Sequence, residues 1–189
     1  MLKKLFFLIF FCLLYSQDSN GNILSSEITN ESQAYKLEEG LDKNIFIIDI
    51  YCNNIDEIAG VQFELPDYFE LLSVEEVRTK DLNFEFHHNS KGLILGFSMS
   101  GDKISPSQNS INNSSTIYGN KGEQYKEDII CSIRIKYIPP TTKEAQINCP
   151  VKTILASPKG ERLTFTSIES KLSLSKYDNP RQIKVSFYE

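Results

Sequence analysis

The chain has 189 residues, of which 40% are hydrophobic and 24% charged, and its formal net charge is −5. The excess of acidic residues argues against a protein that holds nucleic acid or anionic lipid, because clustered Lys and Arg bind such partners. The length suits one hydrophobic core of ordinary size, and no internal repeat or linker divides the chain.

The first element in chain order is a candidate export signal at residues 1–16. Lys3 and Lys4 precede an apolar run of about ten residues, and the small residue Ser16 follows it, which is the pattern of a secretory signal peptide. The run is shorter than the roughly 20 residues of a membrane-spanning helix. We therefore expect cleavage after Ser16, a mature domain at 17–189 with a net charge of −7 and no membrane span, and a secreted location: extracellular, cell-surface or periplasmic. An uncleaved membrane anchor is the alternative.

The mature chain keeps three cysteines, Cys52, Cys131 and Cys149, because Cys12 lies in the signal segment. Exported proteins meet an oxidising environment, so the odd number predicts one disulfide and one remaining thiol. Zinc sites need closely spaced Cys or His ligands. These three cysteines lie far apart in sequence, which argues against a metal centre.

Apolar residues alternate with polar ones along most of the mature chain, and this period of two is the signature of strands with one buried face. The predicted strands cover 23–29, 46–52, 58–65, 70–77, 83–88, 92–98, 128–137, 146–155, 162–166, 170–174 and 183–187. Turn residues such as Asn, Gly and Pro separate them. Only 31–41 and 74–81 could form a helical turn or two. The pattern predicts an all-β sandwich or barrel.

One stretch departs from this pattern. Residues 105–127 are polar and rich in Ser, Asn and Gly, which predicts a long surface loop with little tendency to order.

No catalytic constellation is evident in the sequence. Nucleophilic catalysis needs a base beside the nucleophile, and the two histidines, His87 and His88, are adjacent in a predicted strand and so point to opposite faces. The 25 acidic residues offer many carboxylate pairs, whose ordinary interpretation is a solvated surface. No phosphate-binding, hydrolase, metalloprotease or EF-hand motif occurs. We therefore predict a domain that is not an enzyme and needs no cofactor.

The strand at 92–98 is apolar at nearly every position. If Leu93, Leu95 and Phe97 face the core, Ile94 and Gly96 face outward with Ser98 and form a flat, partly apolar surface. A loop of the same chain or a partner could cover that surface, and the sequence leaves both alternatives open.

Four segments in order resemble the cohesin-like domains, a family of β-sandwich modules of secreted bacterial proteins that shares a superfamily with several carbohydrate-binding modules. They are IDIYCNN at 48–54, IAGVQFEL at 58–65, LGFSMSG at 95–101, and NCP at 148–150 together with ILASPKGE at 154–161. The resemblance extends from about residue 23 to about 165. It implies a single jelly-roll β-sandwich of about nine strands, immunoglobulin-like in general architecture, with 105–127 as an insertion.

The resemblance also implies a function, because cohesins bind calcium-loaded dockerin modules of secreted enzymes through one sheet face. By this analogy the domain is a non-catalytic docking module for a secreted or surface protein. The corresponding strands are 60–65, 83–88 and 92–98, and their expected outward residues are the candidate partner-binding set: Gln62, Glu64, Glu85, His87, Ile94, Gly96 and Ser98. The strand order of the family would also place Cys52 beside Cys131, which makes this pair the preferred disulfide.

Two other functions stay open at this stage. The superfamily includes carbohydrate-binding modules that take part in polysaccharide recognition or breakdown, and these usually need exposed aromatic platforms. The chain has no Trp, so Tyr51, Tyr68, Tyr118 and Tyr125 would have to supply them. A purely structural surface domain is the remaining alternative.

Overall fold

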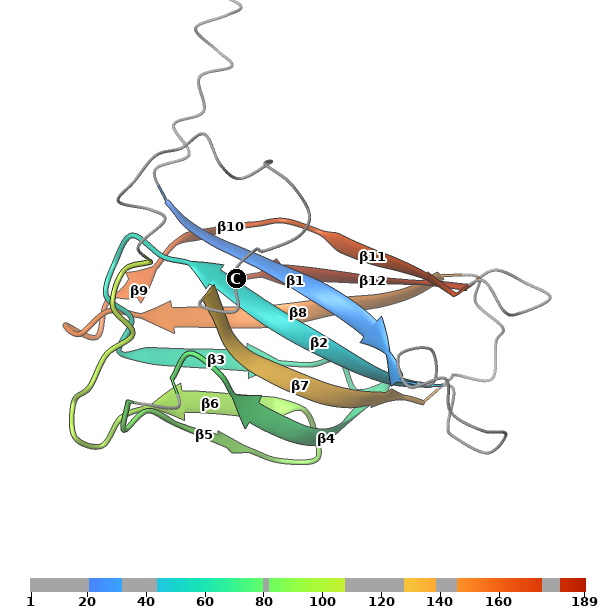
Figure 1. Ribbon diagram of the computed structural model, residues 1–189, viewed down its shortest axis with the longest axis horizontal. Coiled ribbons are helices and arrows are strands. Elements are labelled where there is room, and N and C mark those ends of the chain that lie inside the picture. Colours follow the sequence, from blue (N-terminus) through green and yellow to red (C-terminus); the bar gives the residue numbers. More distant parts are fainter. Residues whose placement is uncertain (1–20, 32–43, 80–81, 108–127, 139–145, 175–180) are drawn as a thin grey trace, which may run out of the picture.

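The computed structural model describes residues 21–31, 44–79, 82–107, 128–138, 146–174 and 181–189, and in this part of the chain twelve strands form two packed sheets (Figure 1). The strands are β1 (Asn22–Asn30), β2 (Ile45–Asn53), β3 (Gly60–Glu64), β4 (Phe69–Glu76), β5 (Glu85–His88), β6 (Leu93–Phe97), β7 (Ile129–Tyr137), β8 (Gln146–Ala156), β9 (Arg162–Leu163), β10 (Phe165–Ser167), β11 (Ser170–Leu174) and β12 (Arg181–Tyr188).

The first sheet has the order β10-β1-β2-β7-β4, and the second has the order β11-β12-β8-β3-β6-β5 with β9 also paired to β8. Most neighbours are antiparallel, whereas β1–β10 and β8–β12 are parallel. The predicted all-β sandwich is confirmed, and the order of strands in each sheet is consistent with a jelly roll. Strands three, five and six lie together in the second sheet, as the family resemblance implies.

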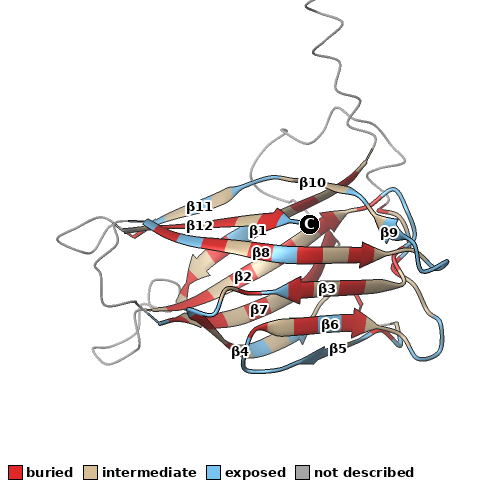
Figure 2. Cartoon of the chain, turned by 180° about the vertical axis from the view of Figure 1, so that it is seen from behind, coloured by how far each residue is buried: buried red, intermediate tan, exposed pale blue. Residues whose placement is uncertain are grey.

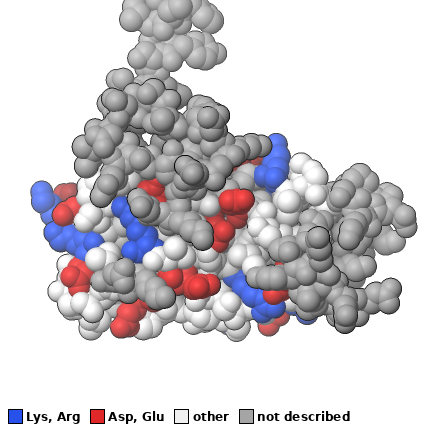
Figure 3. All heavy atoms as spheres, in the orientation of Figure 1, with Lys and Arg blue, Asp and Glu red and all other residues white. Residues whose placement is uncertain are grey.

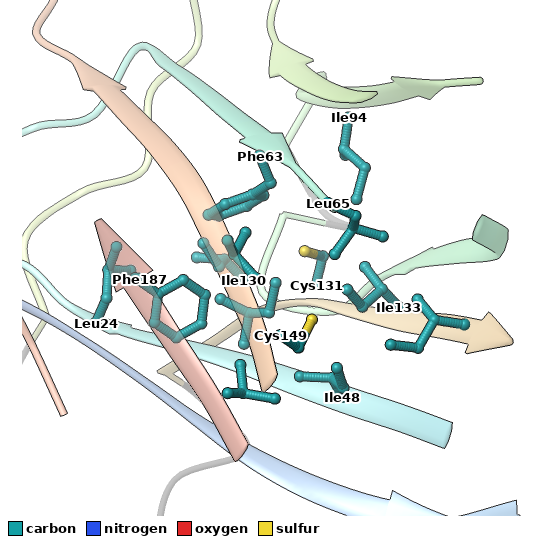
Figure 4. Packing of buried hydrophobic residues seen from close by; sticks show 14 of the residues in the cluster. Leu24, Ile48, Phe63, Leu65, Ile94, Ile130, Cys131, Ile133, Cys149 and Phe187 are labelled. Atoms are coloured by element: carbon teal, nitrogen blue, oxygen red, sulfur yellow. The ribbon is translucent and has the colours of Figure 1, made fainter. Parts of the chain in front are cut away.

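Burial of alternate side chains explains why these segments form a sandwich. In β2, Phe46, Ile48 and Ile50 are at most 1% exposed, and in β12 Ile183 and Val185 are fully buried. Figure 2 shows the resulting alternation of buried and less buried residues along the strands. Each fully buried Ile, Val or Phe contributes roughly 1.5–3 kcal/mol to folding. Side chains from both sheets meet in one core (Figure 4).

The sheets are linked at one side by a chain segment that changes sheets twice. β9 pairs with β8 in the second sheet, β10 pairs with β1 in the first, and β11 returns to pair with β12 in the second. The single strand predicted at 162–166 is therefore two short strands. The number of strands exceeds the nine expected from the family partly for this reason.

The remaining sequence predictions can be placed only in part. The helical turn expected at 74–81 is wrong where it overlaps β4, which continues as a strand to Glu76. The helical turn at 31–41 and the loop at 105–127 fall largely outside the described residues, as does the export signal. Among the described residues, no helix is long and apolar enough to cross a membrane.

The predicted Cys52–Cys131 disulfide is not formed. The two cysteines do lie on neighbouring strands, but Cys131 is in register with Ile50, and Cys52 with Leu24 on the other neighbour. A β-bulge between Ile50 and Tyr51 shifts the register at this point. Cys52, Cys131 and Cys149 are free thiols buried in the core.

Candidate functional site

The three strands that the sequence identified as a binding sheet are hydrogen-bonded neighbours in the order β3-β6-β5. Cross-strand partners in an antiparallel pair share a face, so the register decides which residues point outward. Val61 and Phe63 of β3 are buried, which turns Gln62 and Glu64 outward. On β5, Glu85 and His87 are exposed. These four predicted residues lie on the outer face of the second sheet.

The predicted outward orientation of Ile94 and Gly96 is wrong. Ile94 is fully buried and lies opposite Phe63, and Gly96 is buried opposite Val61. A side chain at position 96 would have its Cβ 2.6 Å from the Phe86 ring and 2.7 Å from Val61 Cγ2. Glycine is therefore required because its neighbours fill the core at this position.

The residues that face outward from β6 are instead Leu93, Leu95 and Phe97. They stand opposite Glu64, Gln62 and Gly60 of β3, and Leu95 is 36% exposed. We call these three residues the β6 strip. Apolar side chains at every outward position of a strand are unusual on a solvated face, because outward positions of antiparallel sheets are normally polar.

The adjoining part of β8 extends this apolar surface. Ile154 is in register with Gln62, and Ala156 is in register with Gly60. Both are partly exposed. One row across the outer face therefore runs from Leu95 through Gln62 to Ile154, with a single amide between two aliphatic side chains.

Charged groups border the β6 strip on both long sides. On β5, the Nε2 atom of His87 lies 3.6 Å from a carboxylate oxygen of Glu85, and both side chains are more than half exposed. On the other side, Lys152 Nζ of β8 lies 3.4 Å from a carboxylate oxygen of Glu64. Exposed ion pairs of this kind contribute little to stability, so their main effect is to surround an apolar centre with a polar rim.

Ser98, the last predicted site residue, lies just after β6 and stabilises a turn. Its Oγ accepts hydrogen bonds from the backbone N–H groups of Ser100 (3.2 Å) and Asp102 (3.1 Å). The Asp102 carboxylate accepts bonds from the Ser100 hydroxyl and from the side-chain amide of Asn83, and these bonds lower its pKa. Met99, in the middle of this turn, is 88% exposed.

The outer face of the first sheet has a different character. Its outward residues carry charges of both signs, which are interspersed over the face in Figure 3. The Tyr51 hydroxyl donates to Glu27 at 3.1 Å, and partial burial, followed by the charge of Glu27, raises the pKa of Tyr51 to about 12. Arg134 forms an ion pair with Glu31 at 2.9 Å. In the part of the chain that the structure describes, no strand of this face has apolar side chains at all of its outward positions, as β6 does.

The described residues offer little for catalysis or sugar stacking. No group of three or more His, Cys, Asp or Glu side chains is placed to hold a metal ion within them. Tyr51 bonds to Glu27 on the outer face of the first sheet. Tyr68, which is 38% exposed, donates its hydroxyl to the backbone carbonyl of Asn148. Tyr118 and Tyr125 lie outside the described residues.

No protein-family model matches this chain, and no curated protein matches it. Among solved structures, the chain is similar to the complex of CaDoc0917 with CaCohA2, with 9% identity, coverage of 88% of this chain and 99% of that chain, and a TM-score of 0.43. It is also similar to a non-cellulosomal cohesin from the hyperthermophilic archaeon Archaeoglobus fulgidus, with 7% identity, coverage of 77% and 82%, and a TM-score of 0.39.

A type II cohesin domain from the cellulosome of Acetivibrio cellulolyticus is similar as well, with 9% identity, coverage of 77% of this chain and 91% of that chain, and a TM-score of 0.36. At these identities the similarity concerns the arrangement of strands, and no residue's role is transferred from it.

Proposed function

We propose that this chain is an exported, non-catalytic binding module that docks a protein partner on the outer face of the second sheet. The β6 strip and Ile154 form the centre of the docking surface. Gln62, Glu64, Glu85 and His87 form its polar rim. The partner is a secreted or surface protein, and a dockerin-type module is the class that the sequence resemblance suggests.

The observation that carries this proposal is the uninterrupted apolar character of the outward side of β6. Leu93, Leu95 and Phe97 occupy all three outward positions of the strand, and Ile154 adds a fourth side chain two strands away. An apolar centre with a polar rim is the usual anatomy of a protein interface. Within the described ranges, no strand on the outer face of the first sheet shows this combination.

Covering the strip would also be energetically favourable. Each aliphatic or aromatic side chain gains roughly 25 cal/mol for every square ångström removed from water. The strip lies on β6, which is hydrogen-bonded to β3 on one side and to the edge strand β5 on the other, so a partner meets a surface that is already ordered. Pre-ordered surfaces lose little conformational entropy on binding.

The expected export of the protein fits the same class of function. The export pattern at residues 1–16 would bring the domain to the envelope or the exterior, where docking modules of the resembled family act. The described residues contain no arrangement of catalytic groups, so binding is the activity that the surface supports best.

The test is affinity capture from secreted and envelope fractions with the tagged domain starting at Gln17, with and without calcium. The key variant is Leu95→Glu, which places a charge at the centre of the strip. The matched control is Ile168→Glu, because Ile168 is an exposed aliphatic residue (41%) between β10 and β11. We expect Leu95→Glu to weaken capture about tenfold or more, the factor equivalent to 1.4 kcal/mol, and the control to bind like the wild type.

Three other results would change the assignment. Equal loss of capture in both variants would contradict the location of the docking surface. Binding to a glycan array without any protein partner would move the assignment to a carbohydrate-binding module. No binding in either format would favour a structural surface domain.

A further inference from the structure

The turn that follows β6 holds a large apolar side chain in solvent. Met99 is 88% exposed, the highest value among the exposed large hydrophobic residues of the described chain. Single exposed apolar residues are common on protein surfaces, so exposure alone would not indicate a role. Its position is what distinguishes Met99, because it comes two residues after Phe97, the last residue of the β6 strip. Consecutive Cα atoms are about 3.8 Å apart, so Met99 adds to the apolar surface at the end of the strip.

The backbone of this turn is fixed by hydrogen bonds on both sides of Met99. The Ser98 hydroxyl oxygen accepts from two backbone N–H groups of the turn. The Asp102 carboxylate accepts from the side-chain amide of Asn83, which lies just before β5. Gly101 has a φ of 83°, a conformation that suits glycine. The Met99 side chain therefore projects from an ordered backbone, while its unbranched thioether can adapt to the shape of a partner.

Met99 also carries the sulfur atom that an oxidant reaches most easily in the folded domain. The sequence contains two methionines, and the other is Met1, in the expected export signal. The three cysteines of residues 17–189, namely Cys52, Cys131 and Cys149, are fully buried in the core. Peroxides convert a thioether into a polar sulfoxide, and methionine sulfoxide reductases reverse the change. Oxidation of the folded domain is thus directed to one position, at the end of the β6 strip.

We propose that Met99 is an oxidation-sensitive anchor of the docking surface, which binds the partner as a thioether and loses affinity as a sulfoxide. This inference rests on the proposed docking surface. With hydrogen peroxide, a sulfur lone pair attacks one peroxide oxygen, the S–O bond forms as the O–O bond breaks, and the other oxygen leaves as water. The sulfur is oxidised and the peroxide is reduced. The new S–O group must then lose its hydration when an apolar partner covers it, which costs free energy unless a hydrogen bond replaces the water.

The first test uses indole as a neutral apolar probe of the strip. The domain starting at Gln17, labelled with ¹⁵N and with ¹³C in the methionine methyl group, is titrated with indole before and after treatment with hydrogen peroxide. Mass spectrometry verifies that one oxygen atom has been added. We expect the Met99 methyl signal to shift together with the amide signals of Leu95 and Phe97, with one dissociation constant. Oxidation should weaken this binding about two- to fivefold, the lower part of the range for burying an unpaired polar group.

Two variants separate the position of the sulfur from its chemistry. Met99→Leu keeps an apolar side chain of similar volume that peroxide does not oxidise, so peroxide should leave its indole affinity unchanged. Met99→Leu combined with Ile168→Met moves the oxidisable side chain to an exposed position between β10 and β11. Oxidation of this double variant should also leave the indole affinity unchanged.

The second test uses the protein whose capture from secreted and envelope fractions requires Leu95. The oxidised wild-type domain should capture less of that protein than the untreated domain. Treatment of the oxidised domain with a methionine sulfoxide reductase should restore capture, and Met99→Leu should capture the same amount with and without peroxide.

Three outcomes would overturn this inference: equal indole affinity of the oxidised and untreated wild type, the absence of a joint shift at Met99, Leu95 and Phe97, or an equal loss of affinity on oxidation of the double variant. Failure of the docking proposal is distinguishable from these. A partner captured through Leu95 regardless of oxidation would refute only the role of Met99. Oxidation-sensitive binding of indole without any captured partner would refute the docking function and leave the sensitivity of the apolar surface to oxidation intact.

Discussion

Two adjacent residues of β6, Ile94 and Leu95, provide a direct test of which side of this strand faces the core. Ile94 is fully buried opposite Phe63, whereas Leu95 is 36% exposed. Truncation of a buried Ile to Ala removes its transfer free energy and leaves a cavity, at a cost of about 2–5 kcal/mol. Truncation of Leu95 removes a partly solvated side chain, and we expect a cost of about 1 kcal/mol.

The difference is large enough to measure by thermal and urea unfolding. For a domain of this size, 1 kcal/mol corresponds to roughly 2–4 °C in Tm. Ile94→Ala should therefore lower Tm by about 4–20 °C, and Leu95→Ala by about 2–4 °C. Circular dichroism of the β-sheet signal is the assay, because the chain has no Trp for fluorescence.

The same pair separates stability from binding. Ile94→Ala should capture the partner like the wild type at temperatures where it is folded, whereas Leu95→Glu should lose capture and keep most of its stability. If Leu95→Ala were as destabilising as Ile94→Ala, or more so, the register assigned to β6 would be refuted. The docking surface built on that register would fall with it.

Three further predictions concern the core and the end of the sandwich. Gly96→Val should destabilise the domain by about 1–3 kcal/mol in urea unfolding, because a Cβ atom there would overlap the Phe86 ring; unchanged stability would contradict the packing. The three core thiols should not react with Ellman's reagent until denaturant is added, because they are buried. Burial also raises their pKa values, to about 12 for Cys52. Rapid reaction of the native protein would refute their burial. An unfolded thiol ionises near pH 8.5 while a folded one stays neutral, so the thiol contribution to stability should be constant below that pH and should fall by up to about 1.4 kcal/mol per pH unit per thiol above it. Arg78→Gln should lower the free energy of unfolding by about 1–3 kcal/mol, because the guanidinium donates hydrogen bonds to the backbone carbonyls of Ser105 and Cys52 and to the side-chain oxygen of Asn54. A Tm equal to that of the wild type would show that these bonds contribute nothing to stability.

The β6 strand shows why the outward face could not be assigned from the sequence alone. Its residues 93–97 read Leu-Ile-Leu-Gly-Phe, so hydrophobicity gives the same answer for either face. The register with β3 resolves the ambiguity, because Val61 and Phe63 are buried and their partners must point the same way. Gln62, Glu64, Glu85 and His87 were predictable, since polar residues alternate with apolar ones on β3 and β5.

The cysteines show a similar limit. Residue counting predicts one disulfide in an exported chain, and the family resemblance places Cys52 beside Cys131. Whether neighbouring strands bring two sulfur atoms together depends on the register, and here a bulge puts Cys131 opposite Ile50. No count or spacing in the sequence contains that information.

The sequence by itself determined the all-β class and most strand positions, because the period of two is a local property of each segment. It also determined which residues of the clearly amphipathic strands are buried. Only the tertiary structure decided the pairing of strands in each sheet, the orientation of β6, the crossing between β9 and β11 and the state of the thiols. These depend on contacts between residues far apart in the chain, which set one register among several that the local pattern allows.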